Sequence, residues 1–232
     1  VQPYDQVAGA FDLLRAVGVE KINADLLYGL PKQTVESARA SAEAAAALGA
    51  DRLAVFGYAH VPHMKSHQNL ILEDDLPGPA ERLAQADAME AALVADGYRM
   101  IGIDHYARPD DPMTRALDAG VLRRNFQGYT TDEADTLIAL GASAIGQTPS
   151  GYVQNAPDVR SWMLAVNAAR PPVAKGVATT REDVMRRALI EQLMTYFTVD
   201  SAAIEADHGL AAPQPELGEL ERAGIVTREG SV

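Results

Sequence analysis

Three histidines and a tyrosine follow a short apolar run in the stretch 51–68, DRLAVFGYAHVPHMKSHQ. The apolar run, residues 53–56, predicts a buried strand, and such a strand presents chemistry in the loop at its carboxyl end. The polar residues of that loop are Tyr58, His60, His63 and His67. On a helix this spacing would gather metal ligands, but Pro62 disfavours a helix and few carboxylates, Asp74 and Asp75 among them, follow nearby. We therefore expect loop hydrogen bonds or substrate contacts from the histidines, and no metal site.

Asp104 and His105 form a second candidate, because they follow a predicted strand at 98–103. A carboxylate beside an imidazole can act as an acid–base pair. Adjacent residues of a strand point to opposite faces, however, so the two side chains need not touch. A structural role for at least one of them is equally open.

Asp25 is a carboxylate inside the apolar run 24–27, ADLL. If that run is a buried strand, the carboxylate must be paired or hydrogen-bonded. A backbone cap or a cofactor ribose hydroxyl would each satisfy it, and we favour the ribose hydroxyl.

Apolar periodicity and glycine positions predict alternating helices and strands before residue 158. Helices are expected at 4–17, 34–48, 80–96 and 113–119, and strands at 21–29, 52–57, 98–103 and 152–155. This order predicts an α/β fold with parallel strands and covering helices. Beyond it, Thr179 and Glu182 match a capping box at the start of a helix. We expect a first domain over 1–157 and a small, mostly helical domain over 158–232.

The composition argues against several classes of protein. The formal net charge is −12, and no long basic run is present, which disfavours a nucleic-acid surface. No apolar segment approaches the roughly 20 residues that span a bilayer, so we expect a soluble, cytoplasmic protein. The 232 residues contain no cysteine, which excludes disulfides and any thiolate-held metal or iron–sulfur cluster within them. Neither a nucleophile elbow nor a phosphate-binding glycine motif is present.

Four stretches, in order, resemble one enzyme family. They are 23–34 (NADLLYGLPKQT), 56–62 (FGYAHVP), 102–111 (GIDHYARPDD) and 124–131 (RNFQGYTT). Together they resemble the oxygen-independent coproporphyrinogen III oxidases (coproporphyrinogen III dehydrogenases) of the radical S-adenosylmethionine superfamily. The similarity extends over nearly the whole chain.

The resemblance implies the later strands and helices of a partial (β/α) TIM-like barrel, followed by a truncated, mostly helical C-terminal domain. It also implies a [4Fe–4S] cluster on a Cys-x3-Cys-x2-Cys motif, whose ligands are expected upstream of Val1, and two S-adenosylmethionine molecules. This chain would then be the C-terminal part of a longer protein and inactive alone, and a degenerate relative that cannot do the chemistry is the alternative.

By the same resemblance, the protein is an oxidoreductase of haem and porphyrin biosynthesis. It would decarboxylate two propionates of coproporphyrinogen III to vinyl groups by a 5′-deoxyadenosyl radical mechanism, giving protoporphyrinogen IX. A flavodoxin or ferredoxin would supply electrons, and a monomer is expected.

The resemblance places cofactor contacts on particular residues of this chain, with Asp25 suited to a ribose hydroxyl. The expected contacts are Asp25, Ala50, Phe56, Ala59, Gln127 and Ile145. No catalytic residue is assigned. Arg108, Arg123 and Arg124 are candidates for binding propionate carboxylates, and simple solvation of these side chains is equally open.

A non-catalytic haem or porphyrin carrier of the same family is the alternative hypothesis. In that case His60, His63 or His105 would ligate the haem iron.

Overall fold

The computed structural model describes residues 2–213 and 215–229, and the chain divides into two compact units, Val1–Asp132 and Glu133–Val232. Among the described residues, no helix has the length and apolarity needed to cross a membrane.

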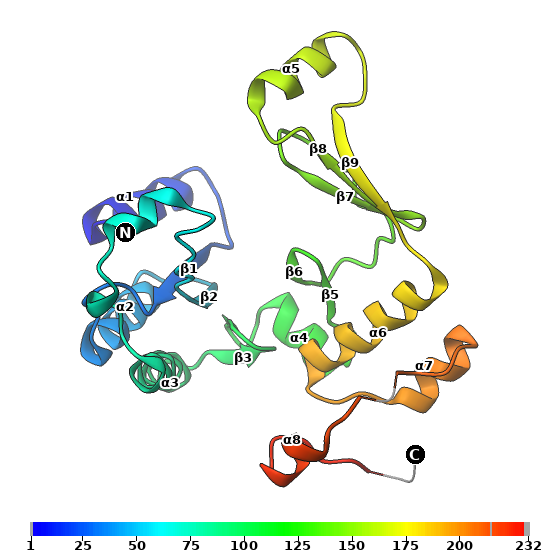
Figure 1. Ribbon diagram of the computed structural model, residues 1–232. Coiled ribbons are helices and arrows are strands. Elements are labelled where there is room, and N and C mark those ends of the chain that lie inside the picture. Colours follow the sequence, from blue (N-terminus) through cyan, green and yellow to red (C-terminus); the bar gives the residue numbers. More distant parts are fainter. Residues whose placement is uncertain (1, 214, 230–232) are drawn as a thin grey trace. The chain divides into compact units, whose positions relative to one another are not determined.

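The first unit, coloured from blue to green in Figure 1, is built on a four-stranded sheet with the order β1-β2-β4-β3. Its strands are β1 (Asn23–Tyr28), β2 (Arg52–Gly57), β3 (Arg99–Ile101) and β4 (His105–Ala107). Its longer helices are α1 (Tyr4–Ala16), α2 (Val35–Ala47) and α3 (Pro79–Ala95). Two short 3₁₀ helices, η1 (Ser66–Leu70) and η2 (Glu73–Asp75), lie between β2 and α3. Helix α4 (Pro112–Asp118) and the hairpin β5 (Arg123–Asn125) and β6 (Gly128–Thr130) complete the unit.

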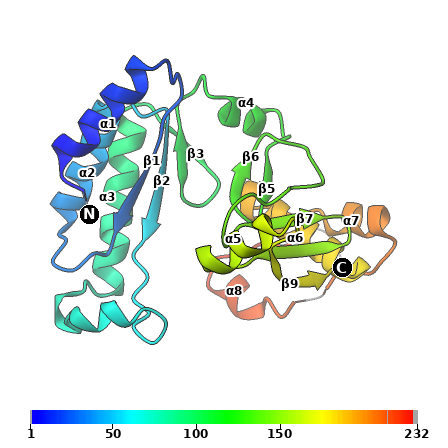
Figure 2. The ribbon, with the colours of Figure 1, turned by 90° about the horizontal axis from the view of Figure 1, so that it is seen from above.

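The core of this unit lies between one face of the sheet and helices α1 to α3, which cover that face (Figure 2). Leu53 and Val55 of β2 point into it, and α3 contributes Met89 and Leu93. Helix α2 contributes only alanines, Ala38, Ala42, Ala45 and Ala46. Because these side chains are small, α2 can approach the sheet and α3 closely. Burial of this apolar surface is the main force that holds the helices on the sheet.

The third predicted strand differs from expectation. Strands β1 and β2 are parallel, as predicted, but β3 and β4 form an antiparallel hairpin, and β4 also pairs antiparallel with β2. The chain reverses at Gly102, whose φ is +59°. A parallel neighbour needs a long crossover connection, whereas this connection is only a tight turn. The expected strand 98–103 is therefore two short strands.

Asp51 ties the amino end of β2 to the preceding segment. Its carboxylate accepts hydrogen bonds from Arg15 at 2.8 Å, Lys21 at 3.0 Å and the Ile22 backbone N–H at 2.9 Å. Burial raises the pKa of the Asp51 carboxyl, but these hydrogen bonds outweigh burial and lower the pKa from 3.8 to about 2.

Replacing Asp51 by asparagine is expected to lower the free energy of unfolding at neutral pH by about 1 kcal/mol. The pKa shift alone corresponds to about 2 kcal/mol, but Arg15 and Lys21 are partly solvated and the interaction is screened. Since the folded-state pKa lies below the unfolded one, the contribution is present above about pH 4 and disappears as the pH falls toward 2. Urea unfolding of the wild-type protein and of Asp51→Asn, at pH 7 and at about pH 2.5, measures the difference in the free energy of unfolding. An equal difference at both pH values would contradict this account.

The described part of the second unit combines an antiparallel sheet with four helices. The sheet has the order β7-β8-β9, with β7 (Ile145–Thr148), β8 (Gly151–Asn155) and β9 (Val173–Ala178). The helices are α5 (Val159–Asn167), α6 (Arg181–Tyr196), α7 (Ser201–His208) and α8 (Gly218–Arg222). The domain boundary expected after residue 157 lies between β8 and β9 in the sequence, and these two strands pair with each other. The boundary itself stays a prediction.

The capping box of α6 lies one residue later than expected. Thr180, not Thr179, is the N-cap, and its hydroxyl accepts a hydrogen bond from the Asp183 backbone N–H. The Asp183 carboxylate in turn accepts from the Thr180 backbone N–H, which takes the place expected for Glu182. Both pairs have the same spacing, so the sequence pattern alone does not distinguish them.

Candidate functional site

The sheet face away from α1 to α3 carries a row of paired residues. The register pairs Asp25 with Ala54, and Ala54 with His105. Directly paired residues place their side chains on the same face of a sheet. The small Ala54 side chain therefore lies between a carboxylate and an imidazole, and Leu27 and Phe56 form the next pair toward the carboxyl end.

Asp25 is exposed on this face, so the expectation that it is buried is wrong. Strand β1 alternates, with Ala24, Leu26 and Tyr28 turned toward the helices and the remaining side chains exposed. The Asp25 carboxylate accepts a hydrogen bond from Asn23 Nδ2 at 2.8 Å. Since a carboxylate can accept more hydrogen bonds than this one, Asp25 can still bind hydroxyl groups of a ligand.

Asp104 and His105 do touch, with 2.7 Å between Asp104 Oδ1 and His105 Nδ1. The alternation of a strand does not apply, because Asp104 lies in the turn before β4. In the neutral imidazole this contact places the proton on Nδ1 and leaves Nε2 as an acceptor. The ring also meets Phe56 and Tyr129 edge-on, with centroids 5.9 Å and 5.1 Å away. The pair thus forms an oriented acid–base group between two aromatic rings.

Tyr129 of β6 fastens the β5–β6 hairpin to the turn between β3 and β4. Its hydroxyl accepts a hydrogen bond from the Ile103 backbone N–H at 3.0 Å. The hydroxyl lies so close to Gly102 that a Cβ atom there would be 2.1 Å away. Gln127 is exposed at the hairpin turn, where its backbone N–H donates to Asn125 Oδ1 at 2.8 Å.

The histidine loop is organised by Gln68, which is 7% exposed. Its side chain accepts from the Val61 backbone N–H at 2.6 Å and donates to the Ala59 carbonyl at 3.0 Å. His63 and His67 are exposed, and His60 is half-buried. Within the described part of the chain, no group of three or more histidine, cysteine or acidic side chains is placed to hold a metal ion.

The cofactor contacts expected from the resemblance fall in different places. Asp25 and Phe56 share the face just described, and Ala59 follows the carboxyl end of β2. Ala50 precedes the opposite end of β2, where it is 1% exposed and its carbonyl accepts from the Tyr98 hydroxyl. Ile145 is half-buried on β7 in the second unit. The structure therefore brings Asp25 and Phe56 together and leaves Ala50 in the core.

Gln85 of α3 is a site-positioning residue that sequence reasoning missed. It is fully buried, accepts from the Gly29 backbone N–H at 2.8 Å and donates to the Gln33 carbonyl at 2.7 Å. It thereby fixes the loop that follows β1. The spacing in the sequence could have identified Gln85 as buried. It lies four residues before Met89 and eight before Leu93, on the buried face of the helix.

Replacing Gln85 by leucine is expected to lower the free energy of unfolding by about 1–3 kcal/mol, because the volume is kept but the Gly29 N–H loses its partner. Hydrogen exchange of the loop after β1 should accelerate. The matched control is Gln6→Leu, an exposed helical glutamine, which should change the free energy of unfolding by less than about 0.5 kcal/mol. Equal effects of the two substitutions would show that Gln85 does not hold this loop.

Arg108, a candidate for binding a propionate, is engaged by side chains of its own unit. Its guanidinium pairs with the Asp96 carboxylate at 2.9 Å and lies over the Tyr98 ring, 3.9 Å from the centroid. Both contacts hold Arg108 at the amino end of β2, where its backbone N–H also donates a hydrogen bond to the Asp51 backbone carbonyl. Arg124 lies over the Tyr129 ring, with 5.4 Å between Cζ and the centroid.

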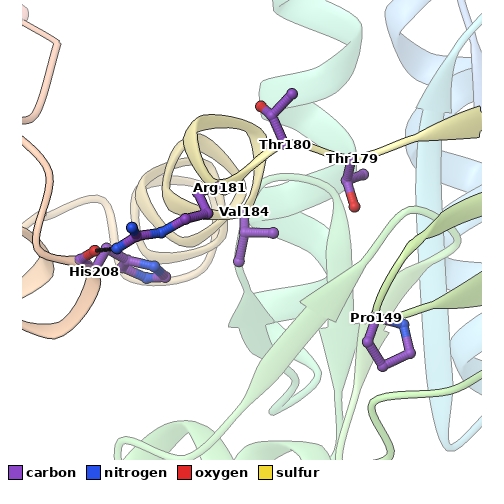
Figure 3. A pocket seen from close by; sticks show the side chains of 6 residues that line it. All are labelled: Pro149, Thr179, Thr180, Arg181, Val184 and His208. Carbon is purple, nitrogen blue, oxygen red and sulfur yellow. Dashed lines mark hydrogen bonds between the residues drawn. The ribbon is translucent and has the colours of Figure 1, made fainter.

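One pocket of the second unit is lined by none of the expected site residues. It is lined by Pro149, Thr179, Thr180, Arg181, Val184 and His208 (Figure 3). Arg181 donates to the His208 carbonyl at 2.9 Å, as the dashed line in Figure 3 shows, and Thr180 is engaged in capping α6. Arg181 and Thr180 therefore support the local structure beside this pocket.

Comparison with known proteins identifies relatives over the whole chain, although no protein-family model matches it. Oxygen-independent coproporphyrinogen III oxidase of Bradyrhizobium diazoefficiens is 44% identical over all 232 residues of this chain and 51% of its own length. The enzyme of the same name from Helicobacter pylori strain J99 is 40% identical over 98% of the chain and 51% of its own length.

Comparison of structures gives the same result. The solved structure of coproporphyrinogen III oxidase (HemN) from Escherichia coli, described as a radical SAM enzyme, is 38% identical and matches with a TM-score of 0.82. The match covers 90% of this chain and 48% of that one. The expected α/β fold of a radical SAM barrel with a C-terminal domain is thereby confirmed. By sequence and by fold, this chain is similar to the oxygen-independent coproporphyrinogen III oxidases, and it spans about half the length of the relatives it matches.

Proposed function

We propose that this chain is part of an enzyme that converts coproporphyrinogen III to protoporphyrinogen IX without oxygen. The observation that carries the proposal is the 44% identity over all 232 residues with an oxygen-independent coproporphyrinogen III oxidase. The carboxylate and the acid–base pair support it, because they lie on the sheet face that α1 to α3 do not cover and are polar groups that a ligand can contact.

The proposed reaction turns two propionate side chains into vinyl groups. Each propionate loses a hydrogen atom from the carbon next to the ring, then releases CO2 and gives up one electron to an acceptor. S-adenosylmethionine, when bound, supplies the radical that takes the hydrogen atom. A flavodoxin or ferredoxin is the proposed electron donor, and the enzyme is proposed to act as a cytoplasmic monomer.

The residues on the uncovered face fit S-adenosylmethionine. The exposed Asp25 carboxylate can accept hydrogen bonds from ribose hydroxyls, which is the role we propose for it. Phe56, Ala59, Gln127 and Ile145 are proposed as further contacts to the cofactor. Ala50 is left out, because its carbonyl and methyl group are already used in the core.

The residues of this chain do not fit an iron–sulfur cluster. Such clusters are held by cysteine thiolates, and the 232 residues contain no cysteine. We propose that the cluster is held by the part of the relatives that this chain does not match, so the 232 residues alone should be inactive.

The experiment that tests the proposal uses the full-length protein containing this chain, reconstituted with iron and sulfide without oxygen. With S-adenosylmethionine and a reductant it should convert coproporphyrinogen III to a product lighter by two CO2 and four hydrogen atoms. Asp25→Asn should weaken S-adenosylmethionine binding roughly 10-fold, whereas the exposed control Asp12→Asn should not. A protein that shifts the Soret band of added haem but forms no product would instead be a carrier.

A further inference from the structure

The arginines of the first unit are mostly held by carboxylates, and Arg82 is different. The paired ones are Arg15, Arg39, Arg52, Arg99 and Arg108. The Arg82 guanidinium makes no hydrogen bond or ion pair with any residue that the structure describes. It is nevertheless half-buried. A half-buried guanidinium with its donors unused, in a chain of net charge −12, is a group that a ligand can satisfy.

Arg82 reaches from α3 to the carboxyl ends of β1 and β2. Gly57 ends β2 and Gly29 follows β1. A Cβ atom at Gly29 would lie 2.6 Å from Arg82 Nη1, and one at Gly57 would lie 3.0 Å from Arg82 Nη2. The guanidinium also faces the Tyr28 ring, with 5.8 Å between Cζ and the centroid. Two glycines thus make room for one cation at the edge where a barrel binds its ligands.

The polar groups of the loop after β1 are paired with neighbouring residues. The Asp75 carboxylate lies 3.4 Å from Lys32 Nζ. Gln85, one turn along α3, uses its amide on Gly29 and Gln33. The loop after β1 therefore satisfies itself and leaves the guanidinium donors to a partner from outside.

We propose that Arg82 binds a carboxylate of the ligand at the carboxyl ends of β1 and β2. The planar guanidinium fork matches the two oxygens of a carboxylate, and the Tyr28 ring steadies the cation from one side. This inference rests on the proposed function, in which the tetrapyrrole carries several propionate carboxylates and S-adenosylmethionine carries one. The shared chemistry is a carboxylate, and a binding experiment distinguishes the two sources.

The experiment titrates the reconstituted full-length protein with coproporphyrin III, followed by fluorescence, and separately with S-adenosylmethionine, followed by calorimetry. Arg82→Gln removes the charge, and Arg82→Lys keeps the charge but not the fork. Arg82→Gln should weaken one of the two ligands roughly 10- to 100-fold, and Arg82→Lys should weaken the same ligand less. The control Arg39→Gln removes an exposed arginine of α2 and should change neither affinity.

A loss confined to coproporphyrin III supports a propionate as the partner of Arg82, and a loss confined to S-adenosylmethionine supports the cofactor carboxylate. If wild-type protein binds both ligands and Arg82→Gln and Arg82→Lys bind them equally well, the inference is wrong and the proposed function stands. If Arg82→Gln does not fold, the inference is tested by Arg82→Lys alone, and affinities equal to those of the wild-type protein for both ligands would show that it is wrong. Wild-type protein that binds neither ligand would overturn the proposed function, and this inference with it.

Discussion

Replacing Asp111 by alanine is expected to lower the free energy of unfolding of the first unit by about 3–5 kcal/mol. The Asp111 carboxylate is fully buried and accepts two contacts from Arg52 Nε, at 2.9 Å and 3.0 Å. Arg52 Nη2 lies 2.9 Å from the same carboxylate. Asp111 is also the N-cap of α4, where it accepts from the Met113 backbone N–H at 2.8 Å. The alanine would remove a helix cap and leave the Arg52 charge without its partner.

Urea unfolding of the two proteins measures this effect, with Asp118→Ala as the matched control. Asp118 also pairs with an arginine, Arg99, but both side chains are about half exposed. Exposed ion pairs contribute little, so the control should lose less than about 1 kcal/mol. A second variant, Arg52→Met, combined with Asp111→Ala, should be less destabilised than the sum of the two single changes. Equal losses for Asp111→Ala and Asp118→Ala would contradict the central place given to this ion pair.

Replacing Gly102 by alanine is expected to lower the free energy of unfolding by about 2–4 kcal/mol and to disturb the acid–base pair. Gly102 has a φ of +59°, which is unfavourable for alanine. The added methyl group would also lie 2.1 Å from the Tyr129 hydroxyl and 2.2 Å from its Cζ. Tyr129 would have to move, which would break its hydrogen bond with Ile103 and change its contact with His105.

Two comparisons separate the clash from the backbone strain. Gly120 has a similar φ of +70°, and no atom would lie within 4 Å of a methyl group added there. Gly120→Ala should therefore lower the free energy of unfolding by only about 1 kcal/mol. In a Tyr129→Ala background the clash is gone, and Gly102→Ala should fall to the same small value. Stability is read from urea unfolding, and the His105 environment from its ring resonances. A loss at Gly102 no larger than at Gly120 would contradict the close approach of Tyr129.

The helices and strands around the core could be predicted because each has a regular apolar pattern. Helix α2 and strand β2, for example, begin and end within a residue or two of expectation. The hairpin β3–β4 could not, since residues 98–103 are mostly apolar and the reversal depends on the left-handed φ of Gly102. Local pattern reports which residues are apolar, but not where the chain turns back on the sheet.

The candidate site was predicted less well, for physical reasons. Asp25 was expected to be buried because the pattern assumed both faces of β1 were covered, whereas only one face is. For Asp104 and His105 the sequence leaves contact between the side chains open, because the turn before β4 is not visible in the pattern. Gln85 and Arg82 were missed because polar residues of a helix usually face water. Their roles depend on the two glycines and the loop that lie opposite them in space.

The proposed function is tested most directly by following one hydrogen atom. Coproporphyrinogen III deuterated on the propionate carbon next to the ring is incubated without oxygen with the reconstituted full-length protein, S-adenosylmethionine and a reductant. The account predicts that 5′-deoxyadenosine recovered from the mixture carries deuterium and that CO2 is released in step with it. Cleavage of S-adenosylmethionine that leaves 5′-deoxyadenosine free of deuterium, with the propionates intact, would contradict it.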